Sequence, residues 1–521
     1  MPPEPLNQLL AIDVGTQSTR AIVFDAQGTL LAKAQVAHEP VHTAPQPGWA
    51  EQDPELYWRA VVAACQGLWT QGIQPADIAG LALTTQRATM ISCDLKGRPL
   101  RPAIVWLDQR ECSAPPVMSA KWRLGFALAG ASPLIRHAQR QAECNWLAQH
   151  EPARWRDTAK FLFLSGWLSH RLTGEFVDST GSQVGYVPFD YKSQQWAVPR
   201  DFKWQAFSIT RDQLPRLVAP GQLMGSLTAA AAAALGLPPQ LPVIAAGADK
   251  ACEVLGCGAT GPRTAQLSFG TSATINTTQS RYLEVQRLLP AYPAAMPAAW
   301  NTEIQINRGF WMVSWFKREF AHRETTLAAE RGVAVESLFD DLVRSVPPGA
   351  QGLTLQPYWS PGVRDPGPEA KGAIIGFGDV HTRAHVYRAI LEGLVYGLRA
   401  GREQIEAKIG ARIDRLVVGG GGSQSDAAMQ ITADIFNLPA ERPALYETSA
   451  LGAAINCAVG LGLHGSHEQA VQAMCRPGVR FTPNAEAVRT YDALYREVYS
   501  QLYPRLKPLY ERIRRITGYP A

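Results

Sequence analysis

Residues 11–25 read AIDVGTQSTRAIVFD, which predicts two short apolar strands joined by a glycine-containing loop. We expect the strands at residues 9–12 and 21–24, with the loop beginning at Asp13. Backbone N–H groups in such a turn can converge on an anion, and its serine, threonine and arginine side chains add further donors. The stretch therefore looks like a phosphate-binding turn, although a carboxylate stands at its start.

The carboxylate of Asp13 has a physical explanation if the ligand is a nucleotide polyphosphate. Such a ligand arrives with magnesium, and the acid then faces a cation or its bound waters. The loop has neither the lysine of GxxxxGK[ST] nor the spacing of GxGxxG. An ordinary hairpin loop with incidental serine and threonine is the alternative, and this motif alone does not decide between the two.

The composition is that of a globular protein, with 46% hydrophobic and 18% charged residues. A chain of 521 residues is too long for one core and predicts two or three domains. The net charge of +5 is small for this length, and no long basic block accompanies it. These features argue against a nucleic-acid partner.

The cysteines and the apolar stretches indicate a cytoplasmic protein without a membrane partner. The eight cysteines include no CxxC pair, and the closest, Cys252 and Cys257, have a spacing that fits no common zinc site. We expect reduced, mostly buried thiols. The first residues, MPPEPLNQ, lack the features of a signal peptide. The Ala-rich stretch from Leu227 is too short to span a membrane.

Local signals place further elements after the opening hairpin. Residues 25–28 form a predicted turn with Asp first and Gly last, and residues 29–36 a third strand. Residues 53–69 begin with an Asp cap and a proline and then follow helical spacing, which predicts a helix. Residues 78–85, IAGLALTT, predict a buried strand.

The second half of the chain repeats part of this plan. Residues 264–278, TAQLSFGTSATINTT, predict a strand, a Gly270-Thr271-Ser272 turn and another strand. The Gly-Thr pair corresponds to Gly15-Thr16 in the first half, which suggests a duplication. One short match is weak support by itself. The Gly- and Ala-rich residues 247–261 are the expected junction.

Asp249 follows the apolar run LPVIAAG and is surrounded by alanine and glycine. An acid with such small neighbours lets a substrate approach closely, and it can accept a proton from a hydroxyl that attacks phosphorus. Asp is also a good helix N-cap. The local sequence leaves both roles open, with the cap favoured.

Four glycines, at residues 419–422, follow the apolar run RLVV and precede a predicted helix. Glycine there lets a flat ring or a phosphate press against the backbone, and four glycines between regular elements are costly to order. We therefore favour ligand binding over a flexible turn. Two long helices are expected at residues 385–409 and 485–515.

Taken together, these features resemble the FGGY family of carbohydrate kinases, which includes glycerol kinase and the pentulose kinases. The resemblance covers nearly the whole chain, and its motifs follow the family's order and spacing. The matching stretches are IDVGTQSTRAIVFD, PGWAEQDPELYWRA, RPAIVWLDQR, HRLTGEFVD, PVIAAGADKACEVLGCG, LSFGTSATI, GAIIGFGDVHTRAHVYRAILEG, VVGGGGSQSDAAMQITADIFNLP and ETSALGAAI.

The resemblance implies an α/β fold of two duplicated ribonuclease-H-like domains, of the hexokinase and actin type, flanking an ATP cleft. We place the N-terminal, sugar-binding domain at residues 1–253 and the C-terminal, adenosine-binding domain at residues 254–521. The implied cofactors are ATP and Mg²⁺. The family also suggests a homodimer or homotetramer.

The resemblance also implies roles for single residues. Asp13 would lie near magnesium, and Asp249 would be the general base. The first phosphate loop would comprise Gly15, Thr16, Ser18 and Arg20, and the second Gly270 and Thr271. The adenosine would lie over Gly420, Gly421 and Gly422, with Ser425 nearby. The acceptor would be bound by Gln86, Arg87, Trp106, Asp108 and Asp249.

Several positions depart from the glycerol kinases and the xylulokinases. Ala88 stands where glycerol kinases carry Glu, and the Gln86-Arg87-Ala88 stretch differs from the Gln-Met-His of xylulokinases. The aromatic that encloses glycerol falls at Ala138 in a loose alignment, and Glu143 replaces the family's lysine before Trp146-Leu147. The loss of the Glu and of the aromatic argues against plain glycerol. It weakly favours a pentulose such as xylulose.

The sequence therefore predicts an ATP- and magnesium-dependent kinase that phosphorylates a hydroxyl of a small sugar or polyol, with glycerol as the alternative acceptor. An inactive nucleotide- or sugar-binding regulator on the same fold is a hypothesis of another class. The presence of Asp13, Asp249 and both Gly-Thr loops argues against it. An actin-like or chaperone-like ATPase is discouraged by the stretches typical of sugar kinases.

Overall fold

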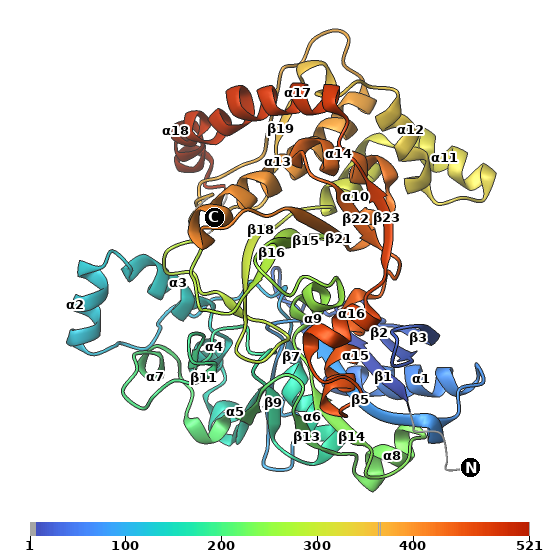
Figure 1. Ribbon diagram of the computed structural model, residues 1–521. Coiled ribbons are helices and arrows are strands. Elements are labelled where there is room, and N and C mark those ends of the chain that lie inside the picture. Colours follow the sequence, from blue (N-terminus) through green and yellow to red (C-terminus); the bar gives the residue numbers. More distant parts are fainter. Residues whose placement is uncertain (1–6, 363, 365, 520–521) are drawn as a thin grey trace. The chain divides into compact units, whose positions relative to one another are not determined.

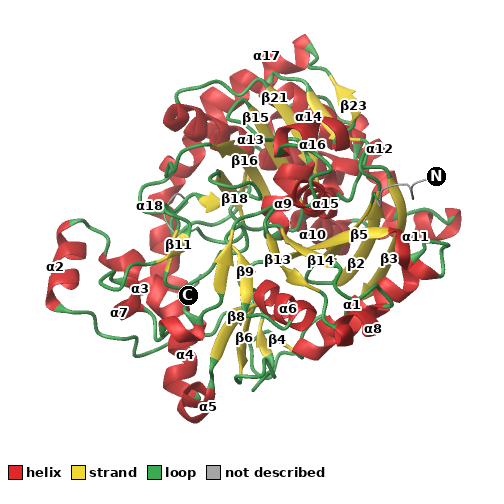
Figure 2. Ribbon diagram, turned by 60° about the horizontal axis from the view of Figure 1, so that its bottom comes forward, coloured by secondary structure: helices red, strands yellow, loops and turns green. Residues whose placement is uncertain are grey.

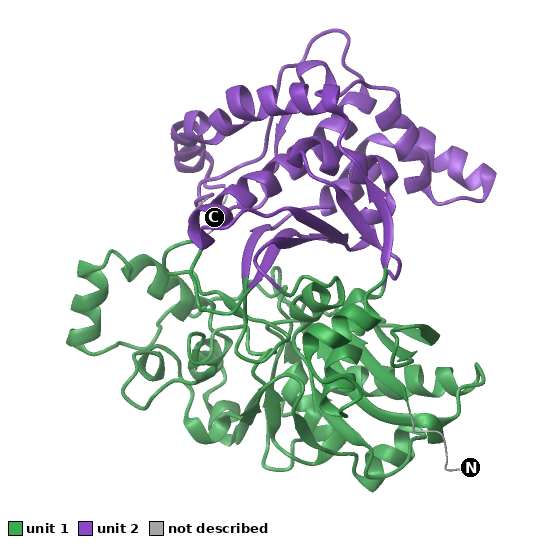
Figure 3. Ribbon diagram, in the orientation of Figure 1, with its two compact units in different colours: residues 1–260, 279–301, 447–476 green, residues 261–278, 302–446, 477–521 purple. Residues whose placement is uncertain are grey.

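The strands predicted around Asp13 are β1 (Gln8–Val14) and β2 (Ser18–Phe24), which pair antiparallel as the first hairpin of the fold. This computed structural model describes residues 7–362, 364 and 366–519. The chain forms two units, distinguished by colour in Figure 3. Unit 1 contains residues 1–260, 279–301 and 447–476, and unit 2 contains residues 261–278, 302–446 and 477–521.

Unit 1 is built on a six-stranded sheet. Its strands in spatial order are β13 (Leu223–Ser226), β14 (Pro242–Ala245), β5 (Ile78–Thr85), β1, β2 and β3 (Leu30–Ala37). The three central strands β14, β5 and β1 are parallel, and their residues are buried because helices pack on this sheet. Helix α1 (Pro54–Trp69) contacts β2 and β3, and α15 (Thr448–Gly460) contacts β1, β5 and β14.

A smaller sheet and several helices complete unit 1 (Figures 1 and 2). The smaller sheet has the order β4 (Glu51–Gln52), β7 (Ala103–Ile104), β6 (Met90–Cys93) and β8 (Lys160–Phe163). Two strand pairs join β9 (Val177–Ser179) to β12 (Arg216–Val218) and β10 (Phe189–Asp190) to β11 (Gln195–Trp196). The other helices are α2 (Ala120–Leu128), α3 (Ser132–Gln141), α4 (Glu143–His150), α5 (Pro152–Asp157), α6 (Leu164–Thr173), α7 (Lys203–Ala206), α8 (Ala229–Leu235), α9 (Asp249–Gly256) and α16 (His467–Met474).

Unit 2 has its own mixed sheet. Its strands in spatial order are β18 (Trp300–Ile306), β16 (Ala273–Gln279), β15 (Thr264–Phe269), β21 (Arg415–Gly419), β22 (Ala440–Pro443) and β23 (Pro477–Phe481), while β17 (Tyr292–Pro293) pairs with the first two residues of β18. A further pair is β19 (Thr354–Gln356) with β20 (Ala373–Ile375). The helices are α10 (Trp311–Phe320), α11 (His322–Arg331), α12 (Phe339–Arg344), α13 (Arg383–Ile409), α14 (Asp426–Phe436), α17 (Ala485–Leu494) and α18 (Ser500–Thr517).

The two main sheets share one topology, which confirms the predicted duplication. In each, an antiparallel hairpin (β1–β2 or β15–β16) is followed in space by two parallel neighbours (β5 and β14, or β21 and β22). An antiparallel strand, β13 or β23, then closes the edge. The fold is thus two related α/β units.

The units do not follow a single cut of the sequence. Residues 279–301 and 447–476 return to unit 1 from the second half of the chain. Residues 447–476 do so because α15 packs on α9 and on the unit 1 sheet. The division into residues 1–253 and 254–521 remains a prediction about the duplicated halves.

Most predicted elements are present, with one long helix divided. The helix expected at residues 485–515 consists of α17, a π-helical turn at Tyr495–Tyr499 and α18, which contains Pro504 and Pro508. The eight cysteines are free thiols in the described part of the chain, and all but Cys475 are buried. Among the described residues, no helix has both the length and the hydrophobicity that a membrane span requires.

Candidate active site

The candidate site of unit 1 lies at the carboxyl ends of its parallel strands. Asp13 is near the end of β1, Gln86 follows β5 and Asp249 follows β14. Since these strands are parallel neighbours, their carboxyl ends meet at one edge of the sheet. Ligands of open α/β sheets bind at this edge. Gln86 is also tied to β1 directly, because its N–H donates to the Val14 carbonyl at 2.9 Å.

Asp13 is a buried carboxylate in a strongly charged setting. Arg20, its partner across the β1–β2 hairpin, donates from Nη1 to Asp13 Oδ2 at 3.1 Å. Burial raises the pKa of Asp13 to about 6; Arg20 opposes this rise, and the carboxylates of Asp249 and Glu447 reinforce it. Asp13 thus offers a buried carboxylate that could face a cation accompanying a phosphate ligand.

Glu447, which sequence reasoning missed as a site residue, joins this group from the start of α15. It forms an ion pair with Lys33 of β3, and Arg20 Nε lies 3.7 Å from its Oε2. Its side chain is buried, so it holds Arg20 and Lys33 firmly. The quoted stretch ETSALGAAI contains this residue, but no local pattern indicates that it pairs with β2 and β3.

The first phosphate loop predicted from the sequence is the connection Gly15–Gln17 between β1 and β2. Gly15 N donates to the Ser18 carbonyl at 3.0 Å, which closes the turn. The Ser18 hydroxyl is buried and accepts a hydrogen bond from Gln35 Nε2 at 3.0 Å. The Thr16 hydroxyl donates to Gln86 Oε1 at 2.9 Å. These two hydroxyls thus have partners inside unit 1.

The acceptor residues predicted from the sequence are connected to this loop. Trp106 Nε1 donates to Thr16 Oγ1 at 2.9 Å, and Gln86 Nε2 donates to the Tyr57 hydroxyl at 3.1 Å. Trp106 is nevertheless 43% exposed. The structure therefore brings Asp13, Thr16, Gln86 and Trp106 together, with an exposed indole held at the edge of the group.

Arg87 lies over the ring of Tyr292, with 5.1 Å between its guanidinium carbon and the ring centroid. Burial raises the pKa of Asp249 and the charge of Arg87 opposes this rise, which places Arg87 and Asp249 in one electrostatic group. Sequence reasoning missed Tyr292, because nothing in its local sequence distinguishes it from a core tyrosine. It supplies an aromatic wall beside a predicted acceptor residue.

Asp249 is the first residue of α9, and the N-cap position belongs to Ala248. The N-cap alternative for Asp249 is therefore wrong. Its Oδ1 accepts from the Lys250 N–H at 2.7 Å. Burial raises the pKa of Asp249, while Lys250 and Arg87 counteract this effect. A carboxyl with a raised pKa is a better proton acceptor than an ordinary aspartate.

Close backbone packing fixes the segment that carries Asp249. Gly181 and Gly247 form a parallel bridge, and a Cβ on Gly181 would lie 3.0 Å from the Gly247 Cα. Thr84 Oγ1 donates to the Gly247 carbonyl at 2.8 Å. The small residues before Asp249 are therefore required by packing.

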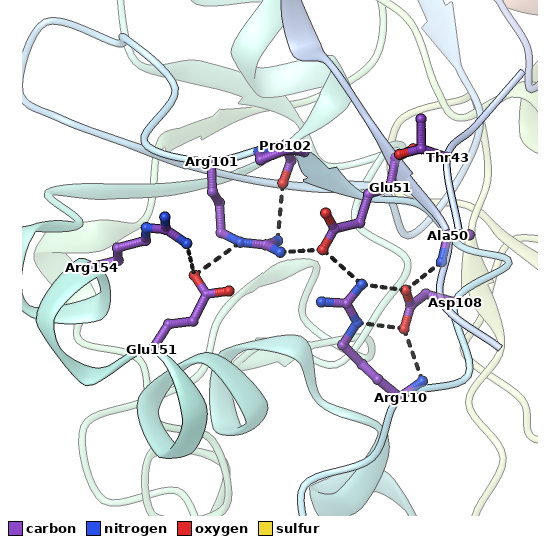
Figure 4. A network of polar contacts seen from close by, with 9 residues as sticks. All are labelled: Thr43, Ala50, Glu51, Arg101, Pro102, Asp108, Arg110, Glu151 and Arg154. Atoms are coloured by element: carbon purple, nitrogen blue, oxygen red, sulfur yellow. Dashed lines mark hydrogen bonds and ion pairs between the residues drawn. The ribbon is translucent and has the colours of Figure 1, made fainter. Parts of the chain in front are cut away.

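Asp108, which was predicted beside the acceptor, is part of a buried ion-pair network (Figure 4). Its carboxylate accepts from the Ala50 N–H at 2.7 Å and from Arg110 Nε and Nη2 at 2.8 and 2.7 Å. Arg110 also pairs with Glu51, which bonds Arg101, and Arg101 in turn reaches Glu151. This network holds Asp108 in place and thereby stabilises the loop after β7, which contains Trp106.

The second predicted phosphate loop lies in unit 2, in the turn between β15 and β16. The Phe310 N–H donates to the Gly270 carbonyl at 3.0 Å, and the Trp311 N–H to the Thr271 carbonyl at 3.3 Å. Phe310 stacks on Phe269 with 4.4 Å between ring centroids. The turn is therefore anchored to the start of α10.

The glycine run adjoins this turn within unit 2. A Cβ on Gly420 would lie 2.8 Å from the Phe269 carbonyl carbon, and one on Gly422 would lie 2.3 Å from the Phe310 ring. A Cβ on Gly421 would meet only the Tyr446 hydroxyl, at 3.4 Å. Ser425 caps α14 and donates to Asp340 Oδ1 at 2.5 Å. Unit 2 thus brings the second loop and the glycines together.

The described residues contain no group of three or more His, Cys, Asp or Glu side chains that could hold a metal ion. The acidic group at Asp13 fits an ion that takes most of its ligands from phosphates and water, as Mg²⁺ commonly does.

Two related α/β units, each with a Gly-Thr hairpin loop, define the duplicated fold of the hexokinase and actin type. Within this fold class, models of the FGGY family of carbohydrate kinases match the chain, with the N-terminal domain over residues 8–256 and the C-terminal domain over residues 265–461. The chain therefore belongs to the FGGY family of carbohydrate kinases. It is an ATP-dependent phosphotransferase that acts on a sugar or polyol.

Individual relatives agree with this assignment. The uncharacterized sugar kinase YgcE of Escherichia coli (strain K12) is 30% identical over 503 residues, which cover 95% of this chain and 93% of that protein. A glycerol kinase of Acidovorax sp. (strain JS42) is 30% identical over 497 residues, covering 92% and 95%. The crystal structure of xylulose kinase from Rhodospirillum rubrum matches with a TM-score of 0.79 at 28% identity, covering 97% of this chain and 100% of that chain.

Proposed function

We propose that this protein transfers the γ-phosphoryl group of ATP to a hydroxyl of a small sugar, with Asp249 as the general base. The observation that carries this proposal is the position of Asp249: it is half-buried at the carboxyl edge of the unit 1 sheet, in one electrostatic group with Asp13 and Arg87. An acceptor hydroxyl beside Asp249 would give up its proton to the carboxylate as its oxygen attacks the γ-phosphorus. The bond from that phosphorus to the β–γ bridging oxygen breaks, and ADP leaves.

Asp13 would hold Mg²⁺, directly or through water, and bound Mg²⁺ would neutralise charge on the phosphate oxygens. Arg20 would supply a second positive charge near the phosphates, oriented by Asp13 and Glu447. Gly270 and Thr271 would contact the phosphates, and Gly420, Gly421 and Gly422 would support the adenosine. Ser425 would act indirectly, because its hydroxyl already caps α14.

For the acceptor we favour a pentulose such as xylulose over glycerol. Ala88 stands where glycerol kinases carry a glutamate, and Arg87 with Tyr292 offers a charged and aromatic wall. The xylulose kinase of Rhodospirillum rubrum supports a pentulose, whereas the glycerol kinase of Acidovorax supports the alternative. ADP release measured over glycerol, erythritol, xylulose, ribulose, fuculose, rhamnulose and gluconate would decide between them.

Replacement of Asp249 by asparagine tests the assignment of the base. Asp249→Asn keeps the size of the side chain and its acceptor for the Lys250 N–H. We expect it to bind ATP normally and to lose phosphoryl transfer by about 10³-fold, within the range typical of a general base. Turnover at the wild-type rate would contradict the assignment. ATP binding with no turnover of any sugar by the wild-type protein would instead favour an inactive regulator.

A further inference from the structure

A buried histidine lies beneath the loop between β1 and β2. His38 directly follows β3, and its side chain is enclosed, with 1% of the residue exposed. Its Nδ1 lies 3.1 Å from the Thr16 carbonyl oxygen, and its Nε2 lies 2.9 Å from Thr19 Oγ1. The ring also meets Tyr57 edge-on, with 5.2 Å between centroids. Both ring nitrogens therefore have hydrogen-bond partners, one in the loop at Thr16 and one in β2 at Thr19.

These contacts define the protonation state of the ring. A carbonyl oxygen can only accept, so Nδ1 must carry the hydrogen that is donated to Thr16. Burial lowers the pKa of His38, which keeps the ring neutral. The unprotonated Nε2 then accepts the hydroxyl hydrogen of Thr19. The imidazole is thus the neutral Nδ1–H tautomer.

The contacts of His38 also orient the backbone of the loop. Its ring holds the Thr16 carbonyl, and its backbone N–H donates to the Gln17 carbonyl at 2.8 Å. In a trans peptide the C=O and the following N–H point in opposite directions. The N–H groups of Gln17 and Ser18 therefore point away from His38. Adjacent N–H groups with one orientation are the donors that bind anions in backbone nests.

We propose that His38 is a positioning residue, which orients the N–H groups of the 15–18 loop toward the nucleotide phosphates. This inference rests on the proposed assignment of that loop to ATP. His38 touches no substrate. It acts through the Thr16 carbonyl, and its side chain therefore affects the binding of phosphates but not the binding of the nucleoside.

Two variants of the full-length protein test this role by calorimetry with ATP and with adenosine as probes. His38→Phe keeps a ring against Tyr57 but removes both polar contacts. His38→Gln retains an amide that can donate to Thr16 and accept from Thr19. We expect His38→Phe to weaken ATP binding about tenfold with adenosine affinity unchanged, and His38→Gln to bind both like the wild type. Unchanged ATP affinity in His38→Phe, or equal losses for ATP and adenosine, would overturn the proposal.

NMR of the wild-type protein with ¹⁵N-labelled histidine provides a second measurement if His38→Phe does not fold. We expect the ring of His38 to be protonated on Nδ1 alone and its signals to shift when ADP is added. The opposite tautomer, or signals unchanged by saturating ADP, would overturn the proposal. Because neither experiment includes an acceptor, the result is independent of whether Asp249 is the base or a pentulose the substrate.

Discussion

Asp178, in the HRLTGEFVD stretch, has a buried carboxyl group. The protonation of this carboxyl is linked to the stability of the fold. Its Oδ2 accepts from Ser165 Oγ at 2.9 Å and from Gln183 Nε2 at 2.8 Å. Burial nevertheless raises its pKa from 3.8 to about 7. The Gln183 Oε1 atom is buried without a partner among the described residues. If the side-chain amide is rotated by 180°, so that Oε1 and Nε2 exchange positions, Oε1 accepts a hydrogen bond from a protonated Asp178.

This raised pKa predicts that Asp178 makes the protein less stable as the pH rises. Below about pH 4, folded and unfolded chains both hold the proton. Between pH 4 and 7 only the unfolded chain releases it, so the free energy of unfolding falls by ~1.4 kcal/mol per pH unit. In Asp178→Asn this contribution disappears. We therefore expect the melting temperature of the variant, relative to wild type, to be roughly 5 °C higher at pH 8 than at pH 5.

The exposed residue Asp157 provides a matched control, because Asp157→Asn makes the same chemical change in solvent. Melting temperatures of both variants are compared at pH 5 and pH 8, so that Asp157→Asn shows what the same replacement does in solvent. A constant difference between Asp178→Asn and wild type across this range would show that Asp178 is ionised in the folded protein.

We expect one added methyl group to destabilise the protein at Gly420 but to have little effect at the neighbouring Gly421. Gly420 has φ +81° and ψ 167°, a conformation that only glycine adopts readily, and its Cβ would also collide with the Phe269 backbone. Gly420→Ala should lower the free energy of unfolding by about 2 kcal/mol or more. Gly421→Ala should change it by less than about 0.5 kcal/mol, because its Cβ meets only the Tyr446 hydroxyl. Thermal unfolding compares the pair, and equal melting temperatures would contradict the prediction.

At the scale of elements, α9 and α15 pack backbone against backbone. A Cβ on Gly256 would lie 2.0 Å from the Thr448 carbonyl oxygen, and a Cβ on Gly452 would lie 2.0 Å from the Cys252 carbonyl oxygen. Figure 1 shows the two helices side by side although they are far apart in the sequence. Since Asp249 begins α9, this contact sets the position of the proposed base.

Gly452→Ala should separate the two helices. The methyl group cannot be accommodated by rotating a side chain, because the colliding atom belongs to the backbone. We expect a loss of about 3 kcal/mol in the free energy of unfolding together with reduced turnover. Gly125→Ala in the exposed helix α2 is the control, since its Cβ would meet nothing within 4 Å. It should be neutral or slightly stabilising. Chemical denaturation measures both, and full stability of Gly452→Ala would argue against the close contact.

Local sequence signals predicted elements well where propensity and packing agree. Asp53 caps α1 with Pro54 at its first position, as expected, and the hairpin strands are longer than the apolar runs that indicated them. The last helix differs, because a π-helical turn at Tyr495–Tyr499 interrupts it. Tyr495 and Tyr499 both pack against Tyr396 of α13, a contact that amphipathic spacing does not reveal.

At the scale of the whole molecule, the chain crosses between the units several times. Unit 1 requires residues 447–476, because α15 is buried against its sheet and Glu447 pairs with Arg20 and Lys33. A fragment of residues 1–260 should therefore lack a cooperative unfolding transition in circular dichroism, since it exposes the apolar surface that α15 covers. Co-expression with residues 445–476 should restore part of its stability. Cooperative melting of the fragment alone at the temperature of the full chain would contradict this expectation.

The sequence by itself determined the two Gly-Thr loops, because they lie in short contiguous stretches with strong local preferences. Through its resemblance to the FGGY family it also implied the duplicated α/β fold. It could not decide between a cap and a base for Asp249, since both use an acid at the start of a helix. It also gave no sign of Glu447, Tyr292 or His38. The tertiary structure excludes the cap, because Ala248 holds the N-cap position of α9. It also reveals the contacts of Glu447, Tyr292 and His38, because their partners are distant in the chain and are brought together by the order of strands in the sheet.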